Sequence, residues 1–114
     1  MNKIPKLVLL AAIALSFSGC ANVDVTKTAS GFYDATNPNN IEILKTKPER
    51  KFIELGTVTV TGFKSNEAAK MHNAIRAKSA PLGANAVILT DEGITPTGLG
   101  SYVRWATGVA IRYN

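Results

Sequence analysis

The chain has 114 residues, with 13 Lys and Arg, 8 Asp and Glu, one His and one Cys. This length excludes a two-domain catalytic architecture and leaves room for one small domain. When residues 1–19 are set aside with their two lysines, the net charge drops from +5 to +3. Such a charge is ordinary for a globular domain and predicts no binding of nucleic acid, which needs a clustered basic surface.

The first nineteen residues have the order of an export signal. Two lysines precede an unbroken run of nine apolar residues, 7–15, and a short stretch of mostly small residues leads to Cys20. Nine residues span about 14 Å as a helix, against a hydrocarbon core of about 30 Å, so the run is too short for a permanent membrane span. We identify residues 1–19 as a signal peptide that is removed from the mature protein.

The end of this signal, Ser18-Gly19-Cys20, resembles the lipobox of bacterial lipoproteins. In that class the cysteine thiol receives a diacylglycerol group, the signal is cut before the cysteine, and the new amino terminus is acylated. Cys20 is the only cysteine of the sequence and therefore has no intramolecular disulfide partner. The resemblance implies that Cys20 is lipidated, and several acyl chains together, palmitate among them, hold a domain firmly to a bilayer. Ala21 in place of Asp implies sorting to the outer membrane, with the domain facing the periplasm.

Residues 20–40 are rich in Asn, Thr, Asp, Ser and Ala and show no sustained period. We predict that they form a flexible tether behind the lipidated cysteine. Phe32 and Tyr33 are unusual in such a linker, and we expect them to dock on the folded domain rather than on a partner.

The single domain is predicted to span residues 41–114, starting with a short strand at 41–44 that is closed by Pro48. A second strand over 52–61 alternates apolar and polar residues. A helix follows from an N-cap at Ser65 to about residue 80, where Pro81 disfavours its continuation.

A continuous apolar run predicts a third strand over 86–89, and residues 91–101, with three Gly and one Pro, predict a loop. In residues 102–113 larger, mostly apolar side chains alternate with a second set that includes two arginines, and this pattern predicts a long last strand. The predicted fold class is α+β: a small two-layer domain with a three- to four-stranded sheet and one main helix, in the order β-β-α-β-β.

The sequence offers little catalytic chemistry. His72 is the only histidine, no serine lies in a nucleophile-elbow sequence, and no group of residues has the spacing of metal ligands. We therefore predict no catalytic residue, no metal, no cofactor and no enzymatic activity. The adjacent pair Asp91-Glu92, in the loop after the third strand, leaves a small-ligand or metal-binding module of the envelope as the alternative.

Exposed apolar side chains in the glycine-rich loop suggest an interaction surface. The candidate contact surface comprises Ile94, Leu99, Tyr102 and Arg104.

The stretch 52–62, followed by a helix that runs into residues 82–88, resembles the YbjQ-like and RcsF-like group of small bacterial domains. The strongest element is Leu-Gly-Ala-Asn-Ala-Val at 82–87, where Gly83 can end a helix in a left-handed conformation. RcsF-like folds depend on disulfides, and this sequence lacks the cysteines, so the resemblance implies the fold and carries over no functional residue. We predict a non-enzymatic lipoprotein that acts through protein contacts in envelope maintenance or stress sensing, with its oligomeric state open.

Overall fold

The computed structural model describes residues 21–114, so the predicted signal peptide and Cys20 lie outside the described residues. Within residues 21–114, no helix combines the length and the hydropathy that a membrane span requires. The strands are β1 (Asn22–Lys27), β2 (Glu42–Leu44), β3 (Phe52–Lys64), β4 (Ala86–Pro96) and β5 (Tyr102–Tyr113); the helices are α2 (Ala68–Ser79) and two 3-10 turns, η1 (Pro38–Asn40) and η2 (Ala80–Leu82).

The strands form one five-stranded sheet in the order β1-β3-β5-β4-β2. All neighbours are antiparallel except β2 and β4, which are parallel. The predicted sheet of three to four strands in the order β-β-α-β-β is therefore wrong. The prediction omitted β1 and did not pair β2 with β4. These two strands are more than forty residues apart in the sequence.

Strand β1 lies within the segment 20–40 that we predicted as a tether. Its six residues pair in register with β3, from Asn22 opposite Thr61 to Lys27 opposite Gly56. Because this strand is short and mostly polar, its position depends on backbone pairing with a distant strand more than on its own pattern. The domain therefore begins at the first residues after Cys20.

The two aromatic residues of this segment behave differently. Tyr33 lies against Gly83, and its ring centroid is 5.2 Å from the Arg112 guanidinium, so this side chain docks on the domain as expected. Phe32 is 88% exposed and contacts the ammonium of Lys27, 4.2 Å from its ring centroid.

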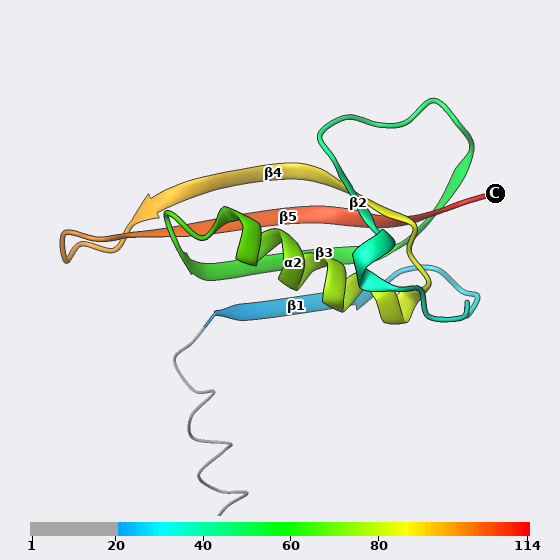
Figure 1. Ribbon diagram of the computed structural model, residues 1–114, viewed down its shortest axis with the longest axis horizontal. Coiled ribbons are helices and arrows are strands. Elements are labelled where there is room, and N and C mark those ends of the chain that lie inside the picture. The colour runs from blue at the N-terminus through cyan, green and yellow to red at the C-terminus, as the bar shows by residue number, and fades with distance from the viewer. Residues whose placement is uncertain (1–20) are drawn as a thin grey trace, which may run out of the picture.

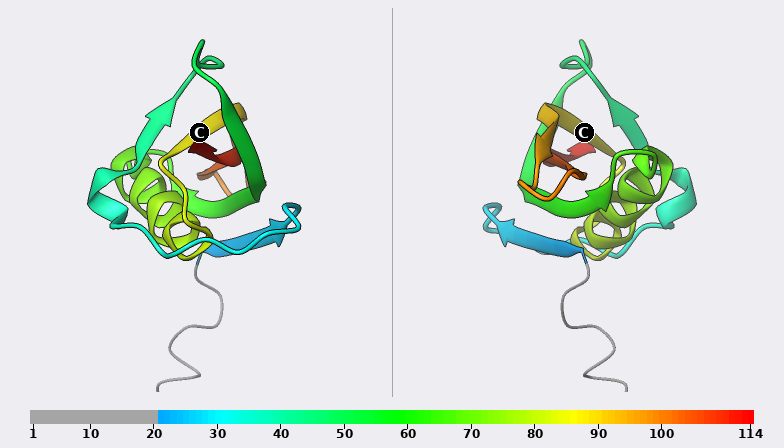
Figure 2. Two further views of the ribbon diagram at one scale, coloured as in Figure 1. Left: turned by 90° about the vertical axis from the view of Figure 1, so that its right-hand side faces the viewer. Right: turned by 90° about the vertical axis from the view of Figure 1, so that its left-hand side faces the viewer.

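Helix α2 packs on one face of the sheet, and the sheet curls so that its two edges, β1 and β2, flank the helix (Figures 1 and 2). Met71, Ile75 and Ser79 are the buried residues of α2. The helix begins later than predicted: its N-cap is Glu67 rather than Ser65, and the Glu67 carboxylate accepts the backbone N–H of Lys64 at 2.8 Å.

Two irregularities in β3 allow both odd-numbered and even-numbered residues of the strand to reach the core. The register with β5 shifts between Glu54 and Gly56 and again between Val60 and Phe63. Each shift inserts unpaired residues and re-aims the side chains that follow, as β-bulges do. Leu55, Val58, Val60 and Phe63 can therefore all be buried under α2.

Strand β4 is longer than predicted. It continues through Asp91 and Glu92 to Pro96, which pairs with Tyr102 at the start of β5. The predicted loop over 91–101 is thus mostly strand, and the connection between β4 and β5 shrinks to residues 97–101. Five of the six residues from Asp91 to Pro96 are polar, glycine or proline, and they are held by the ladder with β5 rather than by burial.

Candidate contact surfaces

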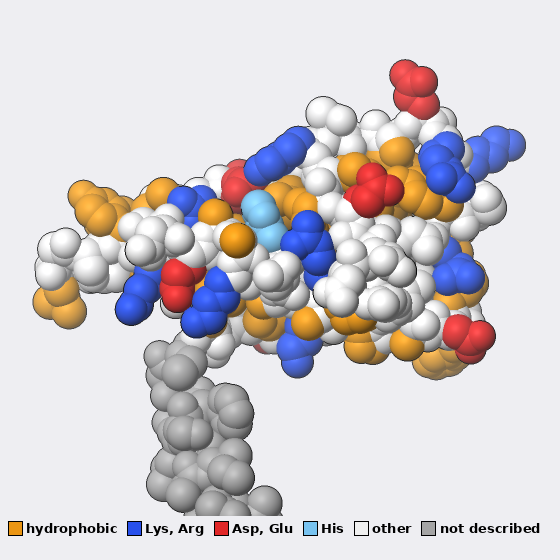
Figure 3. Space-filling view, in the orientation of Figure 1, with side chains coloured by type: hydrophobic (Ala, Val, Ile, Leu, Met, Phe, Trp, Pro, Cys, Tyr) orange, Lys and Arg blue, Asp and Glu red, His pale blue; other side chains and the backbone are white. Residues whose placement is uncertain are grey.

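The end of the β4–β5 hairpin, residues 94–103, is here called the hairpin tip. Three large apolar side chains of the candidate contact surface are exposed on it: Ile94 by 47%, Leu99 by 90% and Tyr102 by 56%. No residue from Thr95 to Val103 carries a charge. Figure 3 shows hydrophobic side chains on two sides of this projecting end, with other side chains and backbone between them.

The loop at the apex of the tip has internal hydrogen bonds that involve Thr97, Leu99 and Ser101. The Thr97 N–H donates to the Ser101 carbonyl at 3.0 Å, and the hydroxyls of Thr97 and Ser101 are 2.8 Å apart. The Leu99 N–H donates to the Thr97 hydroxyl at 3.3 Å. Gly98 and Gly100 adopt φ values of 85° and 80°, and their left-handed conformations place Leu99 at the turn between them.

Arg104, the fourth predicted member of the contact surface, has a structural partner. Its Nε and Nη2 atoms donate to the Ser65 carbonyl at 3.0 and 2.6 Å. These bonds join β5 to the connection between β3 and α2. Beside them lies a hollow of about 540 Å³ lined by residues 62–66 and 100–103.

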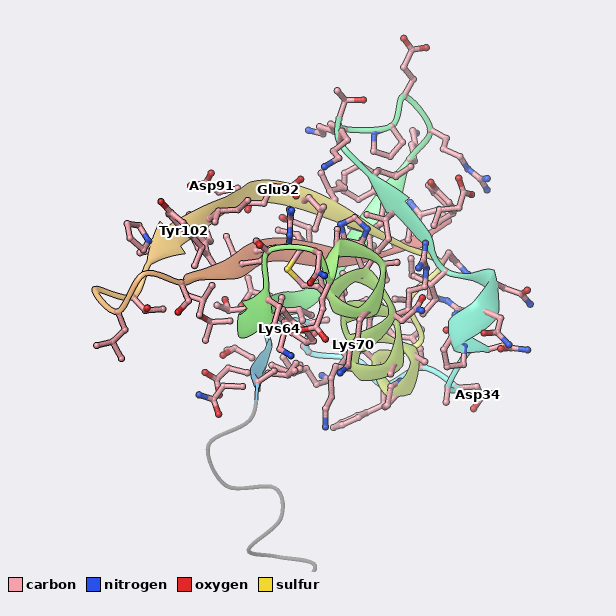
Figure 4. All side chains as sticks on the ribbon, turned by 60° about the vertical axis from the view of Figure 1, so that its left-hand side comes forward. Asp34, Lys64, Lys70, Asp91, Glu92 and Tyr102 are labelled. Carbon is pink, nitrogen blue, oxygen red and sulfur yellow. The ribbon has the colours of Figure 1, made fainter. Side chains whose placement is uncertain are left out.

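The start of β1 lies at the same end of the sheet as the hairpin tip (Figure 1). Ala21 packs against the core, and its Cα would be 3.1 Å from a Cβ at Gly62, a residue with φ 87°. The chain between Cys20 and the folded domain is therefore a single peptide bond. Figure 4 labels Lys64, at the end of β3, and Lys70, on α2, which contacts the Glu67 carboxylate at 3.3 Å.

The opposite end of the sheet has a second hollow, of about 630 Å³, lined by residues 47–54 and Asn114. Cations stack on aromatic rings around it: the Arg50 guanidinium is 3.8 Å from the Tyr113 ring centroid and the Lys47 ammonium 5.8 Å from that of Phe52. We call this surface, residues 47–54 with Tyr113 and Asn114, the far end.

A charged cluster that the sequence did not predict joins β2, α2 and β4. The Lys45 ammonium pairs with the Glu92 carboxylate, and this hydrogen bond is the main reason that the pKa of Glu92 lies below its usual value. Burial lowers the pKa of His72, opposed by the nearby charge of Glu92. His72 and Glu92 are twenty positions apart, so no local sequence signal could have shown their proximity.

This cluster gives little support to the alternative of a ligand or metal module. Glu92 is engaged by Lys45, and Asp91 accepts the Glu92 N–H at 3.0 Å. Within residues 21–114 no three His, Cys, Asp or Glu side chains gather in a way that could hold a metal ion.

The fold is similar to that of a Francisella virulence factor, FvfA, known from a crystal structure. The two chains superpose with a TM-score of 0.59 and 13% sequence identity, over 79% of this chain and 97% of the FvfA chain. At this identity the likeness shows the fold alone. No family model and no curated protein sequence matches the chain, and the resemblance to the YbjQ-like and RcsF-like group stays a prediction.

Proposed function

We propose that the protein is a lipid-anchored lipoprotein of the bacterial outer membrane that faces the periplasm and acts through protein contacts rather than catalysis. The observation that carries the proposal is the Ser18-Gly19-Cys20 sequence at the end of an export signal. The position of Ala21 supports it, because a domain that begins one residue after the modified cysteine is held directly at the bilayer surface.

The far end is the surface that we assign to a protein partner. It lies at the end of the sheet opposite to the start of β1, so it points away from the anchor (Figure 1). Its stacked pairs, Arg50 on Tyr113 and Lys47 on Phe52, combine an apolar plane with a fixed positive charge. Aromatic and arginine side chains of this kind dominate the energetics of protein interfaces.

Lipidation is tested by mass spectrometry of the protein purified from bacterial membranes. The expected mature chain begins at Cys20 and carries a diacylglycerol group and an amide-linked acyl chain. Cys20→Ser should block cleavage of the signal by the lipoprotein pathway. The mass spectrum of this variant should lack the diacylglycerol group and the amide-linked acyl chain. A wild-type protein that retains an unmodified thiol would contradict the proposal.

The partner surface is tested by a photo-cross-linking amino acid at Glu49, which is exposed on the far end. We expect one discrete protein adduct in intact cells, lost when Cys20→Ser removes the anchor. The same cross-linker at Lys78, exposed on α2, is the matched control and should give no such adduct. Equal adducts at both positions, or none at Glu49, would contradict the assignment of the far end.

A further inference from the structure

We propose that the hairpin tip is a second membrane contact, which enters the boundary between headgroups and acyl chains of the bilayer that holds the anchor. The inference rests on the proposed lipidation of Cys20. It adds an orientation to that proposal, because two contacts on one end of the sheet fix how the domain stands on the membrane.

The first argument is position. Val23 of β1 pairs with Val60 of β3, which pairs with Ala106 of β5, so these residues are at one level of the sheet. Tyr102 lies four residues farther toward the tip, or about 14 Å at the rise of an antiparallel strand. The anchor and the tip are thus at the same end of the sheet, and the tip projects beyond the anchor point.

The second argument is the short connection between Cys20 and the folded domain. Ala21 is packed beside Gly62, and consecutive Cα atoms are about 3.8 Å apart, so acyl chains on Cys20 begin within one residue of the folded sheet. A domain held this closely keeps its anchored end at the bilayer surface. The projecting tip then meets the headgroups without any rearrangement of the fold.

The third argument is chemistry. Entry into the interface is costly for charges and for unpaired backbone groups. The nine residues 95–103 carry no charge, and the loop pairs Thr97 with Ser101 and the Leu99 N–H with the Thr97 hydroxyl. Leu99 therefore offers an apolar apex, and Tyr102 has the amphipathic ring that is typical of membrane interfaces.

The fourth argument is the charge around the tip. Arg104 follows the uncharged segment on β5, and Lys64, at the end of β3, pairs in the ladder with Val103. Both are cations at the base of the tip, where anionic headgroups would attract them. The carboxylate of Glu67, in the connection between β3 and α2, is paired with Lys70 at 3.3 Å and accepts the Lys64 N–H.

The shape of the tip favours a bilayer over a protein as its occupant. The loop is a narrow projection of five residues, 97–101, whereas a stable protein interface covers about 800 Å² on each partner. A fluid interface accepts a narrow apolar projection without a complementary pocket.

The test uses the purified lipidated protein with Leu99→Cys, in vesicles of phosphatidylethanolamine and phosphatidylglycerol. The sulfur of Cys20 is blocked by the lipid, so a nitrobenzoxadiazole fluorophore attaches to position 99 alone. We expect a blue-shifted emission, quenching by doxyl-labelled lipid and protection from aqueous iodide. The matched control is Glu49→Cys on the far end, which should keep the emission of a water-exposed probe.

Failure of this inference is distinguishable from failure of the proposed function. If Cys20 is not lipidated, the fluorophore also labels wild-type protein, and the protein does not float with the vesicles. If the protein floats but the probe at position 99 is quenched by iodide as strongly as the probe at position 49, the tip stays in water and the inference is overturned. A discrete protein adduct from a photo-cross-linker at position 99 in cells would also overturn it.

Discussion

At the scale of single residues, Gly83 combines a left-handed backbone with a close tertiary contact. Its φ is 89°, which ends η2 in the left-handed conformation, and a Cβ there would be 2.6 Å from the Tyr33 Cβ. The glycine thus serves two purposes at once: it turns the chain into β4 and it admits the segment that follows β1. The sequence could predict the first purpose from the helix stop, but not the second, because Tyr33 is fifty positions away.

We expect Gly83→Ala to lower the free energy of unfolding by about 3 kcal/mol, from backbone strain together with the clash against Tyr33. Gly98→Ala is the matched control, because Gly98 has φ 85° but no atom within 4 Å of a built Cβ. It should cost only the backbone strain, about 1 kcal/mol. Urea unfolding measures both values, and equal losses in the two variants would contradict the role of the Tyr33 contact.

His72 makes the stability of the domain depend on pH. Burial lowers its pKa below the ordinary 6.5, against the opposing charge of Glu92 and with help from the cations Lys45, Arg76 and Arg104. Its Nε2 is buried without a hydrogen-bond partner among the described residues. The unfolded chain therefore binds a proton more readily than the folded one, and the stabilisation is present above pH 6.5 and is lost as the pH falls through the lowered pKa.

We predict that lowering the pH from about 7 to about 5 decreases the urea midpoint of the wild type. The same change in pH should decrease the midpoint of His72→Gln by less. The carboxylates of Glu67 and Glu92 also have lowered pKa values, but their stabilisation is lost only below their ordinary 4.5. They do not interfere above pH 5. A variant whose midpoint falls as steeply as that of the wild type would show that His72 is not the titrating group.

At the scale of elements, the sequence predicted those helices and strands whose own residues have a regular pattern. The helix, β3 and β5 were found because each has a regular period, and β5 matches its predicted range of 102–113. The distal part of β4 and all of β1 were missed because their residues are mostly polar and are held by ladders to distant strands. The bulges of β3 likewise follow from packing under α2, which no single strand pattern reveals.

The same argument applies to the candidate contact surface. Exposure of Ile94, Leu99 and Tyr102 could be predicted, because large apolar residues in a glycine-rich stretch have little chance of burial. Arg104 was grouped with them by its place in the chain, yet it donates to the Ser65 carbonyl in the connection between β3 and α2. Tertiary partners of this kind are visible only once the strands are in register.

Strand β1 gives a test of whether its pairing is an integral part of the domain. Val23 packs against the core, whereas Val25, two residues on, is 38% exposed. We expect Val23→Ala to lower the free energy of unfolding by about 1 kcal/mol, since it removes partly buried methyl groups at the edge of the core. Val25→Ala should change it by less than about 0.5 kcal/mol. If neither variant changes the urea midpoint, β1 is detached from the cooperative unit in solution.

At the scale of the whole molecule, the two ends of the sheet differ in character. The end with the start of β1 and the hairpin tip is apolar and uncharged at its apex, whereas the far end has cations stacked on aromatic rings. The proposed anchor on Cys20 would fix this asymmetry relative to the membrane. Orientation would then follow from the length of chain between Cys20 and β1, which is a single residue, Ala21.

This dependence on anchor length can be measured directly. Insertion of ten Gly and Ser residues between Cys20 and Ala21 adds a flexible reach of about 17 Å, so the tip is no longer held at the headgroups. We expect the fluorophore at position 99 to lose most of its quenching by doxyl-labelled lipid, while the protein still floats with vesicles. An insertion of the same length in the far-end loop, after Glu49, is the control and should leave the quenching unchanged. Undiminished quenching with the long anchor would show that the tip binds the bilayer by itself, and that the short connection through Ala21 does not set the orientation.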